Sequence, residues 1–530
     1  MTVNGRGGRN MKKRGKRREF LLSGLVSVLA GLILTEAAQA VMIDDKRSLE
    51  FTGKFQSRVS LRLQDSQGFT EPKVSAGDLV QWRNIAYLEV QHDLKYLMGS
   101  VDFMKPLQRW GVEVKYRLVG RFMYEAVYNV GPQVFRDVRD RDRENIDSFK
   151  QSYDLWEAYA DVAKGPVFLR IGRQNLSWGE TDVFRLLDQI NPLDNTFGGI
   201  FEDLDDRRIP LWMLRGSCNF GYVGPIASLT LEGFWVPGNW DAQVSPIAPS
   251  GTPYAVPLPP APVPILTETP GKEMSNSRWG ARLQGVLFDS VNLSLAHYKS
   301  FMDNPSTVLN EEDTGGLIPS YSLGVYYDDV QVTGSALNWW ESHLDVVVRA
   351  EAAWFWEESV FIPEVNTPLV PSGIPIPGLE MLPAQGEKAE KDILRWMIGF
   401  DKSVWLRKLN KTQTFFVSMQ YFGQWISNYD NRIRQPVPIY PDSQNYAGLR
   451  EVEGTLTFLA NTSYMSGQLT PQIVTAYDVR GAWMFQPQVS FIREPFRFLI
   501  QYSGIYGSFT SFGFFRDRDQ VSFVISYLLN

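Results

Sequence analysis

The sequence predicts an all-β fold, a single large transmembrane antiparallel β-barrel of about 18 strands, with 16 as the next choice. Three observations lead to this expectation. Apolar and polar residues alternate along extended stretches of the chain, these stretches run for about ten to sixteen residues, and tight connections alternate with long ones. Strands of soluble sandwiches average about five or six residues, whereas a strand of about ten residues crosses a bilayer at a steep tilt.

The first forty residues predict export. A basic segment from Lys12 to Arg18 precedes an apolar run from Phe20 to Leu34, and small residues follow at Ala38 and Ala40. This is the pattern of a secretory signal peptide with an Ala-X-Ala cleavage site. We therefore expect residues 1–40 to be removed and residues 41–530 to form one outer-membrane barrel domain.

Composition excludes several classes of function. The chain has one cysteine and three histidines in 530 residues, which leaves little material for a redox, metal or acid–base centre. We expect no enzyme activity, no catalytic residue, no metal and no cofactor. Removing residues 1–40 takes away eight Lys/Arg and two Asp/Glu, so the mature chain carries a formal charge of −12. This acidity argues against nucleic acid as a partner.

Each predicted strand has an apolar face and a charged face. Along residues 49–63 apolar residues alternate with polar or charged ones, and the same period of two recurs in residues 112–128, 344–356 and 520–529. A barrel in lipid keeps its apolar face outward, so the charged faces line the lumen. The predicted lumen-facing charges are Arg58, Arg62, Arg117, Arg121, Arg349 and Glu351.

The connections predict the orientation. Tight turns such as Lys164-Gly165-Pro166 alternate with long polar segments such as 176–206 and 238–276. Outer-membrane barrels have short periplasmic turns and long external loops. We expect both termini in the periplasm and the outer membrane of a Gram-negative bacterium as the location. The expected partners are outer-membrane lipid, lipopolysaccharide and the barrel-assembly machinery.

One external segment, RQNLSWGETDVFRLLDQINPLD at residues 173–194, departs from the strand pattern. Its apolar residues between Val183 and Ile190 recur at spacings of three and four, which predicts a short helix that Pro192 ends. Such a helix can fold into the lumen as a constriction, cover the barrel mouth, or form a lid on neighbouring loops.

Our sharpest expectation is that this segment is an ordered, inward-folded gate. Trp178 would contact the wall, and Glu180 and Asp194 would form partly buried ion pairs with Arg173 and Arg185. Replacing Trp178 and Glu180 with alanine would then raise solute flux. The residues assigned to the gate are Arg173, Gln174, Trp178, Gly179, Glu180, Asn191, Pro192 and Asp194.

Two motifs carry a family resemblance. The first comprises Gly172-Arg173-Gln174, Ser177-Trp178-Gly179-Glu180 and Ile190-Asn191-Pro192-Leu193-Asp194, and the second is Arg349-Ala350-Glu351-Ala352-Ala353. Together they resemble a proteobacterial outer-membrane family known as domain of unknown function 1302. The resemblance covers essentially the whole mature chain and implies location and fold, not a substrate.

The leading functional hypothesis is a channel or gated porin-like transporter for small apolar or amphipathic solutes, because a barrel of this size leaves a water-filled lumen. The alternative is a component of an envelope lipid-trafficking or export system, with a periplasmic lipoprotein or an inner-membrane exporter as partner. A barrel hydrolase is a remote alternative, since His92, His297 and His343 are its only candidate bases and none lies in a compact Ser/His/Asp neighbourhood of the sequence.

Overall fold

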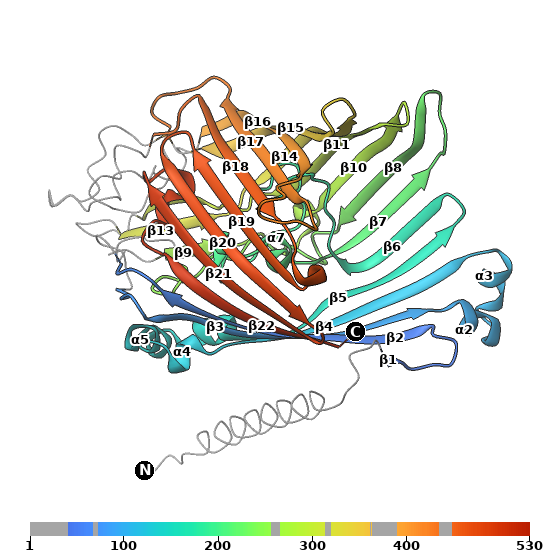
Figure 1. Ribbon diagram of the computed structural model, residues 1–530, viewed down its shortest axis with the longest axis horizontal. Coiled ribbons are helices and arrows are strands. Elements are labelled where there is room, and N and C mark those ends of the chain that lie inside the picture. The colour runs from blue at the N-terminus through green and yellow to red at the C-terminus, as the bar shows by residue number, and fades with distance from the viewer. Residues whose placement is uncertain are drawn as a thin grey trace, which may run out of the picture.

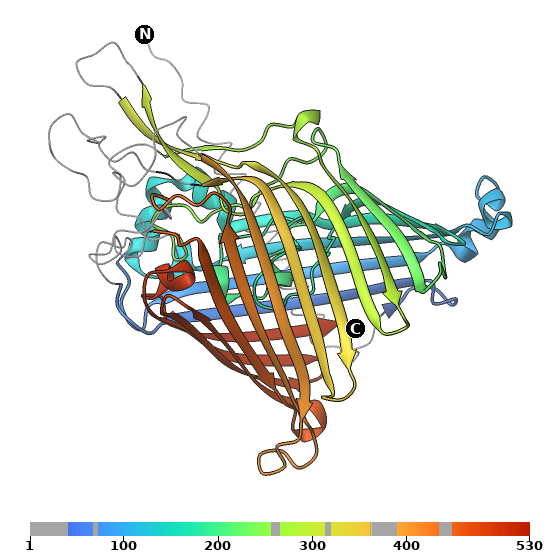
Figure 2. The same cartoon turned by 90° about the horizontal axis from the view of Figure 1, so that it is seen from above.

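The computed structural model describes residues 41–66, 73–255, 265–312, 320–360, 362, 389–433 and 448–529. The predicted cleavage site at Ala38 and Ala40 lies outside these ranges. Eighteen long strands form one closed antiparallel barrel, and the two-residue strand β1 (Val41–Met42) pairs with the first of them (Figures 1 and 2). The prediction of a single 18-stranded transmembrane barrel is confirmed.

The barrel strands follow one another around the wall in chain order. They are β2 (Leu49–Arg62), β3 (Leu79–Asp93), β4 (Glu113–Glu125), β5 (Gln151–Lys164), β6 (Val167–Gln174), β7 (Leu211–Asn219), β8 (Ile226–Val236), β10 (Arg278–Leu287), β11 (Val291–Phe301), β14 (Asp329–Glu341), β15 (Val346–Val360), β16 (Ala389–Val404), β17 (Phe415–Ile426), β18 (Val452–Asn461), β19 (Leu469–Asp478), β20 (Ala482–Arg493), β21 (Phe496–Gly507) and β22 (Gln520–Leu529).

Closure occurs between β2 and β22. Their register runs from Gly53↔Leu529 to Arg62↔Gln520, so the last strand pairs with the first over most of its length. Lipid offers no hydrogen-bond partner to a free strand edge, and a membrane sheet must therefore close. No helix among the described residues is long and apolar enough to cross a bilayer.

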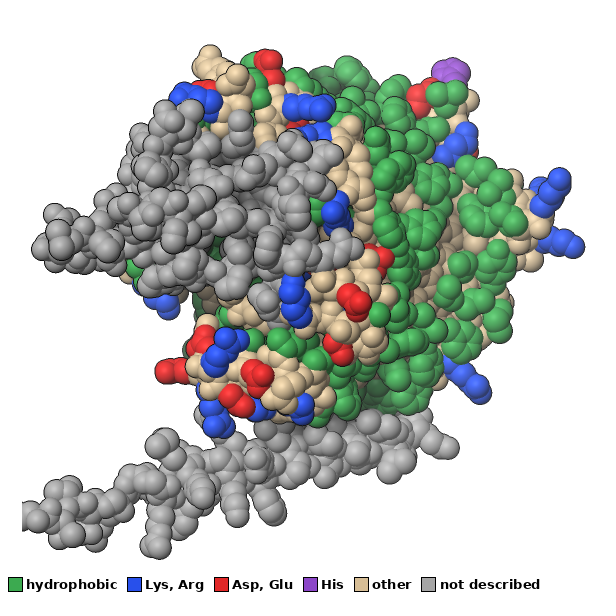
Figure 3. Space-filling view, turned by 90° about the vertical axis from the view of Figure 1, so that its left-hand side faces the viewer, with side chains coloured by type: hydrophobic (Ala, Val, Ile, Leu, Met, Phe, Trp, Pro, Cys, Tyr) green, Lys and Arg blue, Asp and Glu red, His purple; other side chains and the backbone are tan. Residues whose placement is uncertain are grey.

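The alternation of side chains separates the two faces of the wall. On β15, for example, every second residue from Arg349 to Phe355 is buried inside the barrel, whereas Ala350, Ala352 and Trp354 between them face outward. Leu283 on β10 and Leu295 on β11 lie opposite each other on the outer face, and both are exposed. Figure 3 shows that hydrophobic side chains gather into a broad band over the outer wall, as lipid contact requires.

The connections follow the predicted alternation with two departures. The β3–β4 connection, on the side of the tight turns, carries two short helices, α2 (Lys95–Ser100) and α3 (Lys105–Arg109). At the opposite end, β19 and β20 are joined by a tight turn. The connections at that end include α4 (Val127–Val130), α5 (Gln133–Arg141), α6 (Arg143–Lys150) and a three-stranded sheet of β9 (Ile265–Glu268), β12 (Ser306–Glu312) and β13 (Ser320–Tyr326). The connection between β6 and β7 carries α7 (Leu204–Arg207).

The assignment of faces predicts the effect of a charge. In Leu295→Arg, we expect the free energy of unfolding from a bilayer to fall by about 2–4 kcal/mol, the cost of Arg on the lipid face near the midplane. Gln284→Arg is the matched control, because Gln284 lies on the inward face of β10 and should tolerate the charge. Equilibrium unfolding in phospholipid vesicles measures both, and equal losses would contradict the assignment.

Candidate functional site: a loop folded into the barrel

The segment between β6 and β7, residues 175–210, leaves the wall and enters the barrel; we call it the lumen loop. It carries the 3-10 turn η1 (Gly199–Phe201) and the helix α7, and Figure 1 shows α7 inside the ring of strands. Its buried side chains pack on inward-facing residues of the wall from β7 to β17, in the largest apolar cluster of the described structure. The segment therefore folds into the barrel, as expected from the sequence.

Asn191 joins the two ends of the lumen loop. Its Oδ1 accepts a hydrogen bond from the backbone N–H of Leu176 at 2.8 Å, and its Nδ2 donates to the carbonyl of Ile209 at 2.8 Å. Pro192 accepts from the Ile209 N–H at 2.8 Å, and the Asp194 N–H donates to the Arg207 carbonyl at 2.7 Å. The Asn-Pro-Leu-Asp motif therefore pairs with the returning chain and closes the base of the loop.

Trp178 contacts the wall near β8. Its side chain is 1% exposed, and its Nε1 donates to Oε2 of Glu232 at 3.1 Å. Its ring meets Phe234 and Tyr298 edge to face, with centroids 5.2 and 6.0 Å apart. A buried indole needs both an apolar surround and an acceptor, and the wall provides both.

Glu351 on β15 binds the backbone at the tip of the lumen loop. Its carboxylate accepts hydrogen bonds from the backbone N–H groups of Glu180 and of Leu187, the second at 3.1 Å. Gly179 permits this approach, because a Cβ there would lie 2.9 Å from the Cβ of Asp188 and 3.4 Å from the Glu351 carboxylate.

Arg349, on the same face of β15, holds the adjoining residues. Its guanidinium donates to the carbonyl of Glu180 at 2.7 Å and forms ion pairs with Asp182 and with Asp401, the latter at 2.8 Å. The two sequence motifs that resemble a known family are thus in direct contact.

The predicted helix between Val183 and Ile190 is not formed; the segment is an irregular chain of bends. Its backbone forms no helical ladder and bonds in part to side chains of the wall. The Tyr298 hydroxyl donates to the Leu187 carbonyl at 2.8 Å, and the Ser300 hydroxyl donates to the Gln189 carbonyl at 2.9 Å. The apolar residues are nevertheless buried, as the stripe predicted: Leu186, Leu187 and Ile190 are within 2% of complete burial.

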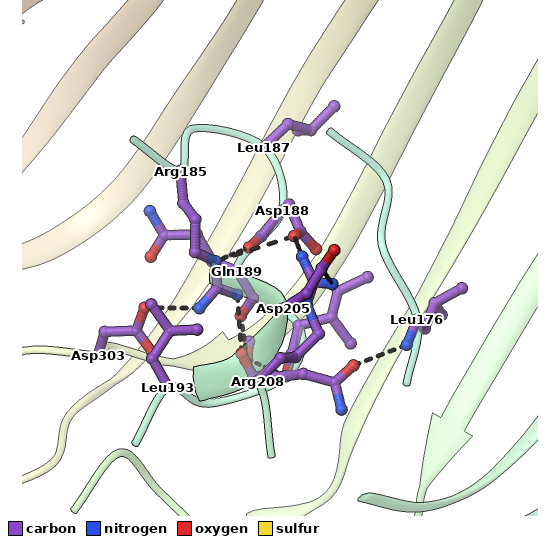
Figure 4. Close-up of polar contacts among 12 residues, drawn as sticks. Leu176, Arg185, Leu187, Asp188, Gln189, Leu193, Asp205, Arg208 and Asp303 are labelled. Atoms are coloured by element: carbon purple, nitrogen blue, oxygen red, sulfur yellow. Dashed lines mark hydrogen bonds and ion pairs between the residues drawn. The ribbon is translucent and has the colours of Figure 1, made fainter. Parts of the chain in front are cut away.

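The expected ion pairs were also wrong in their partners (Figure 4). Arg185 pairs with Asp303 of the β11–β14 connection at 2.8 Å, and Arg208 pairs with Asp188 at 2.5 Å. Asp194 accepts from Thr196 within its own turn, at 2.9 Å for the backbone amide. The side chain of Glu180 is exposed. Its backbone bonds to the wall instead, because its carbonyl accepts from Arg349 and its N–H donates to Glu351.

The far end of the loop reaches the opposite wall. Glu202 is buried against Arg83 on β3, lies 4.0 Å from Arg58 on β2, and accepts from Gln81 at 2.9 Å. Burial raises the pKa of the Glu202 carboxyl, but the charges of Arg83 and Arg58 and the bond from Gln81 outweigh it, so the net pKa is lowered.

The residue before Glu202 makes a second connection to that side of the barrel. The carbonyl of Phe201 accepts from Gln486 on β20 and Gln501 on β21, each at 3.1 Å. The lumen loop is therefore bonded to wall strands on both sides of the barrel.

The predicted lumen-facing charges occupy three settings. Arg349, Glu351 and Arg58 bind or adjoin the lumen loop, as described above. Arg117 pairs with Glu89 and Glu157, each at 2.8 Å, and Arg121 pairs with Asp154 at 3.1 Å while its guanidinium lies 3.4 Å from the centre of the Trp156 ring. Arg62 donates to the Pro253 carbonyl at 3.4 Å.

The remaining residues of the predicted gate motif serve the base of the loop. Arg173 donates to the carbonyls of Leu155 and Pro210, at 2.7 and 3.2 Å. Gln174 is fully buried and donates to the Met213 carbonyl of β7 at 3.2 Å.

Several site residues escaped the sequence reasoning. Glu232, Asp303, Asp188 and Glu202 all bind the lumen loop or lie within it, and no motif marks them. The one usable signal was a charged residue on an inward strand face, which applies to Glu232 alone. The three histidines each contact a different residue: His297 contacts Thr333 on the outer face, His343 contacts Glu341 at an exposed turn, and His92 contacts Tyr116.

The fold and the site together define a class: large antiparallel barrels with an apolar outer face and an ordered loop across the lumen. The chain belongs to the family described as "Protein of unknown function (DUF1302)", which matches residues 21–529. No curated protein matches the sequence.

Solved structures with a similar fold include OccAB1 of Acinetobacter baumannii, at 11% identity and a TM-score of 0.46, with 93% of this chain and 99% of that chain covered. OccK9 (OpdG) of Pseudomonas aeruginosa is 10% identical with a TM-score of 0.46, covering 92% and 99%. OpdK of Pseudomonas aeruginosa with vanillate is 9% identical with a TM-score of 0.43, covering 91% and 98%.

Removing the Glu351 carboxylate should detach the loop tip. In Glu351→Ala the amides of Glu180 and Leu187 lose their acceptor, and we expect the free energy of local opening to fall by about 1–3 kcal/mol. Amide hydrogen exchange of residues 178–190 measures this. Glu180→Ala is the matched control, because that side chain is exposed, and it should leave exchange unchanged. If Glu351→Ala exchanges like the unaltered protein, the carboxylate does not hold the loop.

Acid should loosen the far end of the loop. The pKa of Glu202 is lowered in the folded state, so its stabilisation is present above the ordinary carboxyl pKa and is lost as the pH falls through the folded value. The protection factors of the amides of residues 199–203, which compare the measured exchange rate with the intrinsic rate at the same pH, should therefore fall at low pH. Glu202→Gln should exchange faster at neutral pH and lose most of this pH dependence. An unchanged dependence in the variant would assign the effect to another group.

Proposed function

We propose that this protein is a gated outer-membrane channel for small apolar or amphipathic solutes, and that the lumen loop is its gate. A closed barrel of 18 strands is wide enough to enclose a solute path. Its lumen carries charges of both signs, most of them already paired with one another, so we expect weak ion selectivity.

One observation carries the proposal: the lumen loop is bonded to strands on opposite sides of the barrel. Glu351 and Arg349 hold its tip on β15, while Arg83, Gln81 and the glutamines of β20 and β21 hold its far end. These contacts are individual hydrogen bonds and ion pairs rather than strand pairing. The loop can therefore leave one wall without opening the barrel sheet.

The interior suggests the class of solute. The wall from β7 to β17 presents apolar side chains to the loop, among them Phe234, Val332 and Phe355. The opposite wall presents Arg58, Arg83 and Gln81. A molecule with one apolar and one polar end would find a matching surface on each side once the loop moves.

The same apolar wall would also fit the acyl chain of a lipid, which favours the lipid-trafficking alternative to an equal degree. That role requires a periplasmic lipoprotein or an inner-membrane exporter that hands over lipid. Affinity capture of the intact barrel from native membranes separates the two: such a partner would support trafficking, and swelling of proteoliposomes in solutions of small amphipathic solutes would support the channel.

The gate predicts a change in conductance. Glu351→Ala should raise the mean single-channel conductance in a planar bilayer, and deletion of residues 180–194 should raise it further, because each removes material or contacts that span the lumen. Glu180→Ala serves as the control and should conduct like the unaltered protein. If the deletion variant inserts and still shows no conductance, the protein is not a channel.

A further inference from the structure

The barrel wall is incomplete beside the lumen loop. Strand β5 spans Gln151–Lys164, but β6 pairs only with its residues Ala158–Lys164. The outer part of β5, residues 151–157, has β4 on one side and no strand on the other among the described residues. We call this opening in the sheet, between residues 151–157 of β5 and the start of β7, the wall gap.

Gly172 explains why the pairing stops. Its φ is +134°, a conformation that L side chains rarely adopt, and a Cβ there would lie 2.1 Å from the Ala158 carbonyl. At this residue β6 diverges from β5, and only one further pair, Ala158↔Arg173, follows. The chain then turns inward at Asn175 to begin the lumen loop.

Side chains close the wall gap in place of a strand. The guanidinium of Arg173 donates to the Leu155 carbonyl on β5 at 2.7 Å and to the Pro210 carbonyl before β7 at 3.2 Å. Asn175 adds a bond to Oε1 of Glu157 at 2.9 Å. These bonds can open without disturbing any strand pair, unlike the backbone ladder elsewhere in the barrel.

The wall gap lies at the level of the lipid. Strand β6 has 8 residues. At a rise of about 3.3 Å per residue and a tilt of about 40°, it covers about 20 Å of height, less than the apolar band of about 25 Å in such barrels. The side chains that flank the gap on the outer face are apolar and exposed: Tyr153 and Leu155 on β5, and Trp212 on β7.

We propose that the wall gap is a lateral exit, through which an apolar or amphipathic solute passes between the lumen and the outer leaflet of the membrane. This inference rests on the proposed channel function and specifies its path. Both ends of the lumen loop lie at the wall gap, and passage of a solute there requires the bonds of Arg173 and Asn175 to open. An apolar solute then leaves into lipid without crossing the external aqueous layer.

A crosslink across the wall gap tests the exit. In a Cys218→Ser background, Leu155→Cys and Trp212→Cys are joined in detergent by a flexible bis-maleimide, and the protein is reconstituted into vesicles whose outer leaflet is lipopolysaccharide. The matched control joins Leu283→Cys and Leu295→Cys, which face each other across an intact strand pair on the outer wall. Two quantities are measured. The first is the ionic conductance, and the second is the rate at which a pyrene-labelled fatty acid, supplied in the vesicle interior, reaches the outer leaflet of the bilayer.

We expect the crosslink at the wall gap to reduce fatty-acid transfer to the rate of protein-free vesicles, with conductance unchanged, and the control crosslink to alter neither. Transfer that persists across the crosslinked gap would overturn the lateral exit while leaving the channel intact. Absence of both conductance and transfer in the uncrosslinked protein would overturn the channel itself. Arg173→Lys provides a second variant: an ammonium group cannot bridge both carbonyls as the guanidinium does, so transfer should accelerate.

Discussion

The structure depends on pairing backbone groups, both in the wall, where lipid excludes water, and in the lumen loop, where they are buried. The barrel meets the requirement through its ladder, which closes where β22 pairs with β2. The tip of the lumen loop has no strand beside it among the described residues, and it meets the same requirement in part through wall side chains. Glu351 accepts from two backbone amides, and Tyr298 and Ser300 donate to two carbonyls. An unpaired buried amide costs about 1–3 kcal/mol, so these few side chains determine the course of the loop.

This dependence explains the chemistry of the two family motifs. The second motif provides an arginine and a glutamate two residues apart, which places both on the inward face of one strand. The first motif provides a glycine where the glutamate approaches and a tryptophan whose N–H reaches Glu232. Asn191 satisfies both ends of the loop with one amide group. The first motif therefore bonds to side chains on strands that are distant from it in the sequence.

The same arrangement connects the pore with the wall. Gly172, with its positive φ, lies one residue before the last pair of β6 with β5, and the chain leaves the wall for the lumen loop shortly after it. Arg173 then bonds across the space that a longer strand would fill. A channel of this design has two coupled openings, one along its axis and one toward lipid, because a single segment takes part in closing both.

The sequence by itself determined the barrel, its strands and the inward charged faces, since alternation and turn residues are local properties of the chain. It also showed that residues 173–194 depart from the strand pattern, and it predicted an apolar stripe that includes Leu187 and Ile190. Only the tertiary structure decided that this segment is irregular rather than helical, and that Arg185 pairs with Asp303 rather than with Glu180 or Asp194. The physical reason is distance along the chain: Tyr298 binds the loop from 111 residues away and Glu351 from 164, and closure of the barrel brings them together.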